Sequence, residues 1–176
     1  MRRAGGLWPT IVAFENLRTS ALRAARGKRR VAGAASFLAD LELRVLRLQR
    51  ELEAGTWRPG RAFTFTIHDP KTRTITAAPF RDRVVHHALV DRLEPVFERR
   101  MVFESFACRR GKGTHAALGH ARRQFRRFAF FLKLDVRKCF DSLDHEVVLG
   151  TLARAVKDRR VLTWQDASSA SGVGPA

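Results

Sequence analysis

A carboxylate that directly follows an apolar run is the first feature of this sequence that could do chemistry. Residues 128–134, FAFFLKL, are almost all apolar or aromatic, and Asp135 comes next. The run is short, rich in aromatic residues and closed by a charged turn, which favours a strand buried on both faces over a buried helix. A carboxylate at the end of such a strand is held rigidly beside the core while it faces an open edge. The pattern therefore predicts a metal ligand at Asp135.

The residues after Asp135 extend this pattern. The chain turns over 136–142 and re-enters the core through Phe140, and Asp144 can cap a helix that begins near His145. A purely structural interpretation fits these residues equally well, with Asp135 ending a strand and Phe140 filling a core. The neighbouring phenylalanines fit a core better than a base-stacking platform; they are Phe125, Phe128, Phe130 and Phe131.

Residues 135–145 resemble the first catalytic motif of reverse transcriptases. That motif has an aspartate, an aromatic residue five positions later and then Asp-x-(Ile/Leu)-x-His, which here are Asp135, Phe140 and 141–145. The resemblance implies that Asp135 binds the catalytic magnesium ions, with the carbonyl of Val136 assisting. It also implies that Phe140 stacks under the sugar of the incoming nucleotide and rejects a 2′-hydroxyl. Such polymerases use two metal ions, one activating the primer hydroxyl and one steadying the leaving pyrophosphate.

Alternating residues upstream predict a β-hairpin. Residues 61–67 and 72–77 alternate between the two faces of a strand, and the sequence His-Asp-Pro at 68–70 suits a reverse turn. Pro79 then opens a helix. The apolar face of this helix is formed by Val84, Val85, Ala88, Leu89, Leu93 and Val96 or Phe97.

This hairpin and helix resemble the fingers segment of bacterial reverse transcriptases, those of group II introns and, more closely, of diversity-generating retroelements. The resemblance implies that Arg73 contacts the triphosphate of the incoming nucleotide, and a planar, always-charged guanidinium matches phosphate oxygens well. The family lysine six or seven residues earlier is absent here, so Lys71 is its candidate substitute. The matching residues are Arg73, Ile75, Pro79, Arg81, Asp82, Arg83, Val84, Val85, Ala88, Leu89, Leu93, Glu94, Pro95, Phe97 and Glu98.

A glycine-rich basic stretch follows this helix. Residues 105–117 match the family pattern Ser-x-Ala-x-Arg-x-Gly-(Lys/Arg)-Gly-Thr-His-x-Ala. The backbone amides of GKGT, residues 111–114, lead into a helix and would cradle a phosphate, which the resemblance assigns to the template strand. The candidate nucleic-acid-binding residues are Arg81, Arg83, Arg109, Arg110 and Lys112.

Positive charge dominates the composition. There are 34 Lys and Arg against 17 Asp and Glu, a formal net charge of +17. This excess indicates a polyanionic partner, because neutralised phosphates release condensed counterions; arginine enrichment in a GC-rich genome is the alternative. No apolar run approaches the roughly 20 residues that span a bilayer, so no membrane partner is expected. The two cysteines, Cys108 and Cys139, lack metal-ligand spacing and a disulfide framework, which suits the cytoplasm.

The expected architecture is α+β. Two helices, over 11–26 and 36–54, are expected before the hairpin, and the second has a clear apolar stripe of Phe37, Leu41, Val45, Leu48 and Leu52. We expect four regions: an N-terminal helical region (1–60), fingers with the hairpin and helices (61–127), a partial palm with the first palm strand and catalytic motif (128–160) and an irregular tail (161–176).

The sequence contains neither an Asp-Asp pair nor a tyrosine, whereas reverse transcriptases carry a later Tyr/Phe-x-Asp-Asp motif. We therefore expect a chain cut short by a frameshift, a stop or an incomplete gene, and inactive by itself. The parent enzyme would be an RNA-directed DNA polymerase that binds an RNA template, a DNA primer, deoxynucleotides and two Mg²⁺ ions. The alternatives are a non-catalytic RNA-binding module and an inactive pseudogene product, and the sequence names no accessory protein.

Overall fold

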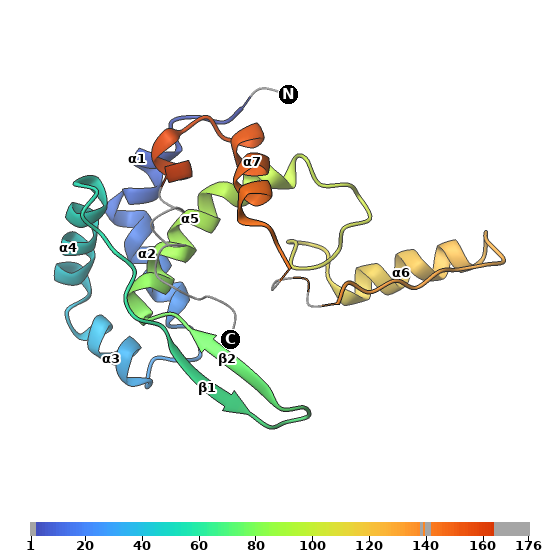
Figure 1. The fold of residues 1–176 in the computed structure, drawn as a ribbon, viewed down its shortest axis with the longest axis horizontal. Coiled ribbons are helices and arrows are strands. Elements are labelled where there is room, and N and C mark those ends of the chain that lie inside the picture. The colour runs from blue at the N-terminus through green and yellow to red at the C-terminus, as the bar shows by residue number, and fades with distance from the viewer. Residues whose placement is uncertain (1–2, 138, 140–141, 164–176) are drawn as a thin grey trace.

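The computed structural model describes residues 3–137, 139 and 142–163, and the fold is α+β with a small antiparallel sheet (Figure 1). The phenylalanine predicted to gate the nucleotide sugar, Phe140, lies outside these residues. The elements in chain order are α1 (Leu7–Val12), α2 (Phe14–Ala24), α3 (Ala32–Ala39), α4 (Leu41–Glu53), β1 (Phe63–Ile67), β2 (Arg73–Ala77), α5 (Phe80–Glu98), α6 (Thr114–Phe125) and α7 (His145–Ala155).

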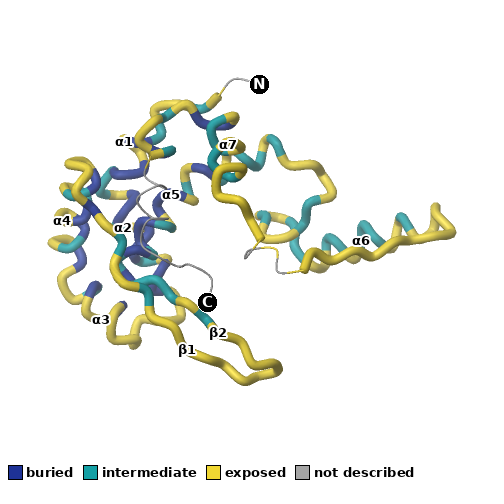
Figure 2. Tube along the Cα trace, viewed as in Figure 1, coloured by how far each residue is buried: buried dark blue, intermediate teal, exposed yellow. Residues whose placement is uncertain are grey.

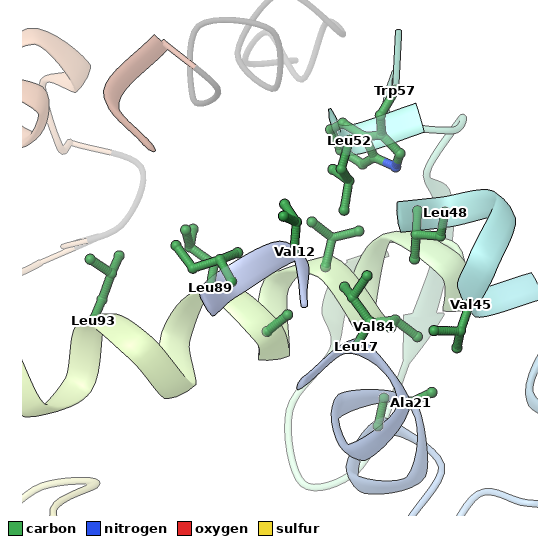
Figure 3. Close-up of a cluster of buried hydrophobic side chains, with 14 of the residues drawn as sticks. Val12, Leu17, Ala21, Val45, Leu48, Leu52, Trp57, Val84, Leu89 and Leu93 are labelled. Carbon is green, nitrogen blue, oxygen red and sulfur yellow. The ribbon is translucent and has the colours of Figure 1, made fainter. Parts of the chain in front are cut away.

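The core forms where α2 and α4 pack around the long helix α5. The buried face of α2 repeats at helical spacing and consists largely of small residues, such as Ser20, Ala21 and Ala24, which let α2 approach α5 closely. The predicted apolar faces of α4 and α5 are both buried here (Figure 3). The same cluster includes Trp8 near one end of the chain and Val161 near the other. One hydrophobic core therefore unites segments that are distant in sequence.

Two breaks divide the predicted N-terminal helices. The helix expected over 11–26 is divided into α1 and α2 at Ala13, whose ψ of 135° is not helical. The helix expected over 36–54 is divided at Asp40, and the preceding helix α3 begins earlier, at Ala32. Each break lets the chain change direction and follow the core, and α3 reaches α5 through a contact between the rings of Phe37 and Phe80, whose centroids lie 5.3 Å apart. Apolar spacing alone does not reveal such a change of direction.

The predicted β-hairpin is confirmed and projects from the helical body (Figure 1). Strands β1 and β2 pair with Phe65 opposite Ile75 and Ile67 opposite Arg73. Opposed residues share a face of the sheet, so one face carries the apolar side chains together with Arg73. The other face carries only threonines, namely Thr64, Thr66, Thr74 and Thr76. A buried carboxylate fixes the base of the hairpin, because Asp82 on α5 accepts a 2.7 Å hydrogen bond from the backbone N–H of Gly60.

The predicted buried strand over 128–134 is wrong. These residues have no regular secondary structure, and Phe130 is 92% exposed and Leu132 81% exposed. Their neighbours Phe125, Phe128 and Phe131 are also exposed, so the expectation that they fill a core is wrong too. A central strand needs hydrogen-bonding neighbours on both sides, and the part of the chain that the structure describes offers it none, because its sheet consists of β1 and β2 alone.

Helix α6 and the segment after it form an excursion from the body. Figure 2 shows α6 alternating between half-buried and exposed residues and the segment after it exposed, and α6 has no buried residue. The chain returns to the body at α7, which begins with the predicted cap: Asp144 Oδ1 accepts hydrogen bonds from the N–H groups of Glu146 (2.8 Å) and Val147 (3.4 Å). The end of α7 and the residues after it then dock against the N-terminal segment, where the N–H of Ala4 donates to the carbonyl of Ala155 and the N–H of Lys157 donates to the carbonyl of Ala4, both at 2.8 Å. Among the described helices, none has the length and apolar character needed to cross a bilayer.

We expect Leu17→Ala to lower the free energy of unfolding by about 2–5 kcal/mol, because Leu17 is 0% exposed in the core. The change Phe130→Ala should alter it by less than about 0.5 kcal/mol, because this ring faces solvent. Urea denaturation followed by the fluorescence of the buried Trp8 and Trp57 measures both. An equal loss of unfolding free energy in the two variants would contradict this division between the core and the exposed segment after α6.

Candidate nucleotide and nucleic-acid sites

Two exposed cations mark the tip of the hairpin. Arg73 is the first residue of β2, and Lys71 lies in the turn that precedes it. Among the residues that the structure describes, no carboxylate lies within ion-pair distance of either side chain. The turn is braced locally by a 3.2 Å hydrogen bond between His68 Nδ1 and Thr72 Oγ1. A rigid hairpin thus presents two free positive charges, one of which shares a face with Phe63 and Phe65.

Arg109 holds together the loop between α5 and α6. Its guanidinium donates to both carboxylate oxygens of Glu98, with N–O distances of 2.6 to 3.1 Å, and to the carbonyls of Val102 (2.7 Å) and Ser105 (2.8 Å). The Arg109 side chain is only 8% exposed. The hydrogen bond from Arg109 lowers the pKa of Glu98, and the same bond raises the pKa of Arg109. The guanidinium therefore fixes the loop from inside.

Lys112 and three rings attach this loop to α6. The ammonium of Lys112 lies 4.2 Å from the ring centroid of Phe103 and 5.1 Å from that of Phe106, and it donates a hydrogen bond to the carbonyl of Phe103. His120 on α6 packs against both rings. Contacts of a cation with two ring faces are favourable and help to order the loop.

Glycines shape the entry into α6. Gly111 has φ 69° and Gly113 has φ 103°, backbone values that residues with a Cβ rarely adopt. The N–H of Gly113 donates to the carbonyl of Phe106 at 3.1 Å, and α6 begins at the next residue, Thr114. The predicted order of glycine loop followed by helix is confirmed, and the first N–H groups of α6 face the end of this loop.

Carboxylates and aromatic rings hold the remaining predicted cations. Arg81 forms an ion pair with Glu51 on α4, and Arg110 lies 3.7 Å from Glu94 on α5. Arg83 lies over the ring of Phe80, with 5.4 Å between its guanidinium carbon and the ring centroid. Much of the charge that the sequence assigned to nucleic acid is therefore balanced within the protein.

The predicted metal ligands do not come together. Asp135 and Val136 are exposed in the excursion after α6, and no described carboxylate or cation is paired with Asp135. No group of three or more His, Cys, Asp or Glu side chains suited to a metal occurs among the described residues. Figure 1 also shows the hairpin of β1 and β2 and helix α6 projecting from separate parts of the body. The described residues do not by themselves form a magnesium site.

Sequence reasoning gave no role to the arginines at the end of α2. Arg23, Arg26 and Arg29 line a hollow together with Thr19. The signal was visible as the basic run over 26–30, but its spacing matched no motif and the run could have been a solvated surface.

A comparison with protein families identifies the class of this chain. Residues 67–169, more than half of the 176, match the family described as reverse transcriptase (RNA-dependent DNA polymerase). Strand β2 with Arg73, the glycine loop and Asp135 lie inside this match, which begins at the last residue of β1. The chain belongs to the reverse transcriptase family.

Three relatives show the range of similarity. Nuclear intron maturase 1, mitochondrial, of Arabidopsis thaliana is 41% identical over 83 residues, which are 47% of this chain and 12% of the maturase. Group II intron-encoded protein LtrA of Lactococcus lactis subsp. cremoris is 25% identical over 123 residues, 68% of this chain and 20% of LtrA. Protein YkfC of Escherichia coli (strain K12) is 25% identical over 130 residues, 70% of this chain and 34% of YkfC. The chain spans at most about a third of the length of these relatives.

Acidification should loosen the loop over 99–113. Because the pKa of Glu98 is lowered in the folded protein, its ion pair with Arg109 stabilises the loop above the ordinary carboxyl pKa, and this contribution is lost as the pH falls through the lowered pKa. Hydrogen-exchange protection factors of the loop amides, corrected for intrinsic rates, should fall over that range.

The variant Glu98→Gln should give low protection in this loop at every pH and no further fall on acidification. Glu104→Gln, an exposed carboxylate in the same loop, is the matched control and should behave like the wild type. A similar pH response in Glu98→Gln and the wild type would show that another group controls the loop.

Proposed function

We propose that this chain supplies the fingers and the first catalytic carboxylate of an RNA-directed DNA polymerase. The reaction is the template-directed addition of deoxynucleotides to a primer 3′-hydroxyl, with RNA as template. The observation that carries the proposal is the free guanidinium of Arg73 at the tip of a rigid hairpin, inside a stretch that matches the reverse transcriptase family.

Arg73 is suited to hold the triphosphate of an incoming nucleotide. Its guanidinium has no competing carboxylate among the described residues, so binding a phosphate would not require an internal ion pair to break. Lys71 adds a second charge from the adjoining turn. The apolar face that Arg73 shares with Phe63 and Phe65 offers a surface for the base and sugar.

The loop before α6 is proposed to receive the template backbone. The contacts of Arg109 with Glu98 make it a positioning residue for this loop, while the N–H groups at the start of α6 provide the phosphate-binding groups. Lys112 adds charge at the same place, although its contacts with Phe103 limit its reach.

Asp135 is proposed to be one of several carboxylates that hold the catalytic Mg²⁺ ions. A two-metal site needs at least two such carboxylates, and no cluster of three or more metal-binding side chains occurs around Asp135 among the described residues. The remaining acidic ligands must come from residues outside the described ones or from another polypeptide. Phe140, proposed to gate the sugar, lies outside the described residues.

A second candidate function is a non-catalytic RNA-binding module. The net charge of +17 and the exposed position of Asp135, away from any described metal-binding group, favour it. In that case RNA binding would depend on salt and would not change with Mg²⁺ or with Asp135→Ala.

Arg73→Ala should abolish the effect of nucleotide on primer–template binding. The binding of a fluorescent oligo(dT)–poly(rA) substrate to the 176-residue chain is measured by anisotropy with Mg²⁺, with and without dTTP. We expect dTTP to tighten binding in the wild type, and we expect this effect to fall by about tenfold or more in Arg73→Ala.

The exposed Arg61, near the base of the same hairpin, provides the matched control. Arg61→Ala removes the same charge and should keep the dTTP effect within about twofold of wild type. If both variants lost the dTTP effect equally, Arg73 would act only through its positive charge and not through a specific contact with the triphosphate.

The purified 176-residue chain should not extend the primer, because it contributes only part of the required carboxylate set. Incorporation of radiolabelled dTTP into oligo(dT) on poly(rA) measures this directly. Primer extension by the wild type that disappears in Asp135→Ala would contradict this prediction, because it would show that the 176-residue chain suffices for catalysis.

A further inference from the structure

The segment over 129–136, which follows α6, carries backbone groups without partners. It lies in no helix or strand, and no backbone hydrogen bond between described residues has its donor or its acceptor there. Its side chains are exposed as well, Phe131 at 76% and Leu132 at 81%. The segment contains neither proline nor glycine, so every residue in it can take part in a β-ladder. An exposed apolar run with unpaired N–H and C=O groups is a template for pairing with another chain.

Opposite charges flank this run. Arg127 precedes it, and Asp135 stands near its other end. Neither side chain forms an ion pair with any residue that the structure describes. A second copy of the run, lying antiparallel, would bring its Asp135 toward Arg127 of the first copy. A parallel copy in register would instead place each charge beside its like, which is unfavourable in a sheet. The charges therefore favour the antiparallel arrangement.

Charge also selects one register among the symmetric antiparallel ones. A two-fold axis between paired strands places one residue opposite its own copy, and every other pair follows from counting outward. With Phe131 on the axis, Arg127 lies opposite Asp135 at both ends of the ladder. Moving the axis to the preceding residue places Arg127 opposite Lys133, and moving it to the following residue places Arg127 opposite Arg137. Each of these neighbouring registers sets like charges against each other.

We propose that residues 127–135 pair antiparallel with the same residues of a second copy, in a dimer whose two-fold axis passes beside Phe131. The ladder gives partners to the N–H and C=O groups that face it, and it joins Arg127 to Asp135 twice. It also sets Phe130 opposite Leu132, so that apolar side chains exposed in the single chain cover one another. While the copies are paired, Asp135 is held by an arginine, and it becomes available to Mg²⁺ only when they separate.

Single-stranded RNA fits this segment less well than a second copy does. Its bases could stack on the exposed rings, but they would leave the unpaired backbone groups of the run without a regular partner. The carboxylate of Asp135 would also repel the phosphates. A second copy satisfies the backbone groups, the apolar side chains and the charges at the same time.

Sedimentation velocity of the full chain over a range of protein concentrations tests the proposal, after nuclease treatment and without Mg²⁺ or nucleotide. We expect a monomer–dimer equilibrium that persists after the nuclease. Arg127→Asp and Asp135→Arg should each raise the dimer dissociation constant by about tenfold or more, because two attractions become two repulsions. An equimolar mixture of these variants should restore dimers, because the mixed pair regains an attraction at both ends of the ladder. Leaving out Mg²⁺ and nucleotide separates this result from the fate of the proposed polymerase role.

The matched control is Arg122→Asp, which makes the same change of charge at an exposed position on α6, outside the proposed ladder. We expect its dimer dissociation constant to stay within about threefold of the wild-type value. Circular dichroism and thermal melting confirm that all variants fold. A wild-type chain that stays monomeric, species larger than a dimer, equal weakening in Arg122→Asp, or no recovery in the mixture would overturn the proposal. Self-association that the nuclease abolishes would instead assign the segment to RNA.

Discussion

The burial of α5 against α2 and α4 is the constraint on which the other features depend. Its apolar face makes the core, and its carboxylates reach outward to fix the surrounding segments. Asp82 holds the base of the hairpin, Asp91 pairs with Arg23 on α2, and Glu98 holds the loop before α6. One helix therefore sets the positions of three segments around it, among them the hairpin and the loop that carry the proposed functions. Loss of its packing would displace all of them together.

Internal pairing decides which positive charges are available to a ligand. A net charge of +17 indicates a polyanionic partner but does not locate it. The structure uses Arg81 and Arg109 to join elements of the protein, and it leaves Arg73 and the residues around Arg26 without carboxylate partners among the described residues. The paired arginines thus give rigidity, and the hairpin tip is one of several places among the described residues where positive charge has no carboxylate partner.

The apolar segment over 128–134 shows how a strand prediction can be wrong although its composition is typical. FAFFLKL has the composition of a strand buried on both faces, but a strand forms only where neighbouring strands complete its hydrogen bonds. In the described part of the chain the sheet ends with β1 and β2, and Phe130 faces solvent. The match to the reverse transcriptase family over 67–169 is unaffected, because it follows from the residue pattern.

The sequence by itself determined the local elements and the class of protein. The hairpin, the helix after Pro79, the cap at Asp144 and the reverse transcriptase family were all predicted, because turn residues, apolar spacing and motif order act over short distances. Only the tertiary structure decided that Arg109 is paired, that Asp135 is exposed, and that the apolar segment over 128–134 faces solvent. These outcomes depend on partners distant in sequence, and the physical reason is that a charge or a strand acquires its role from its neighbours in space.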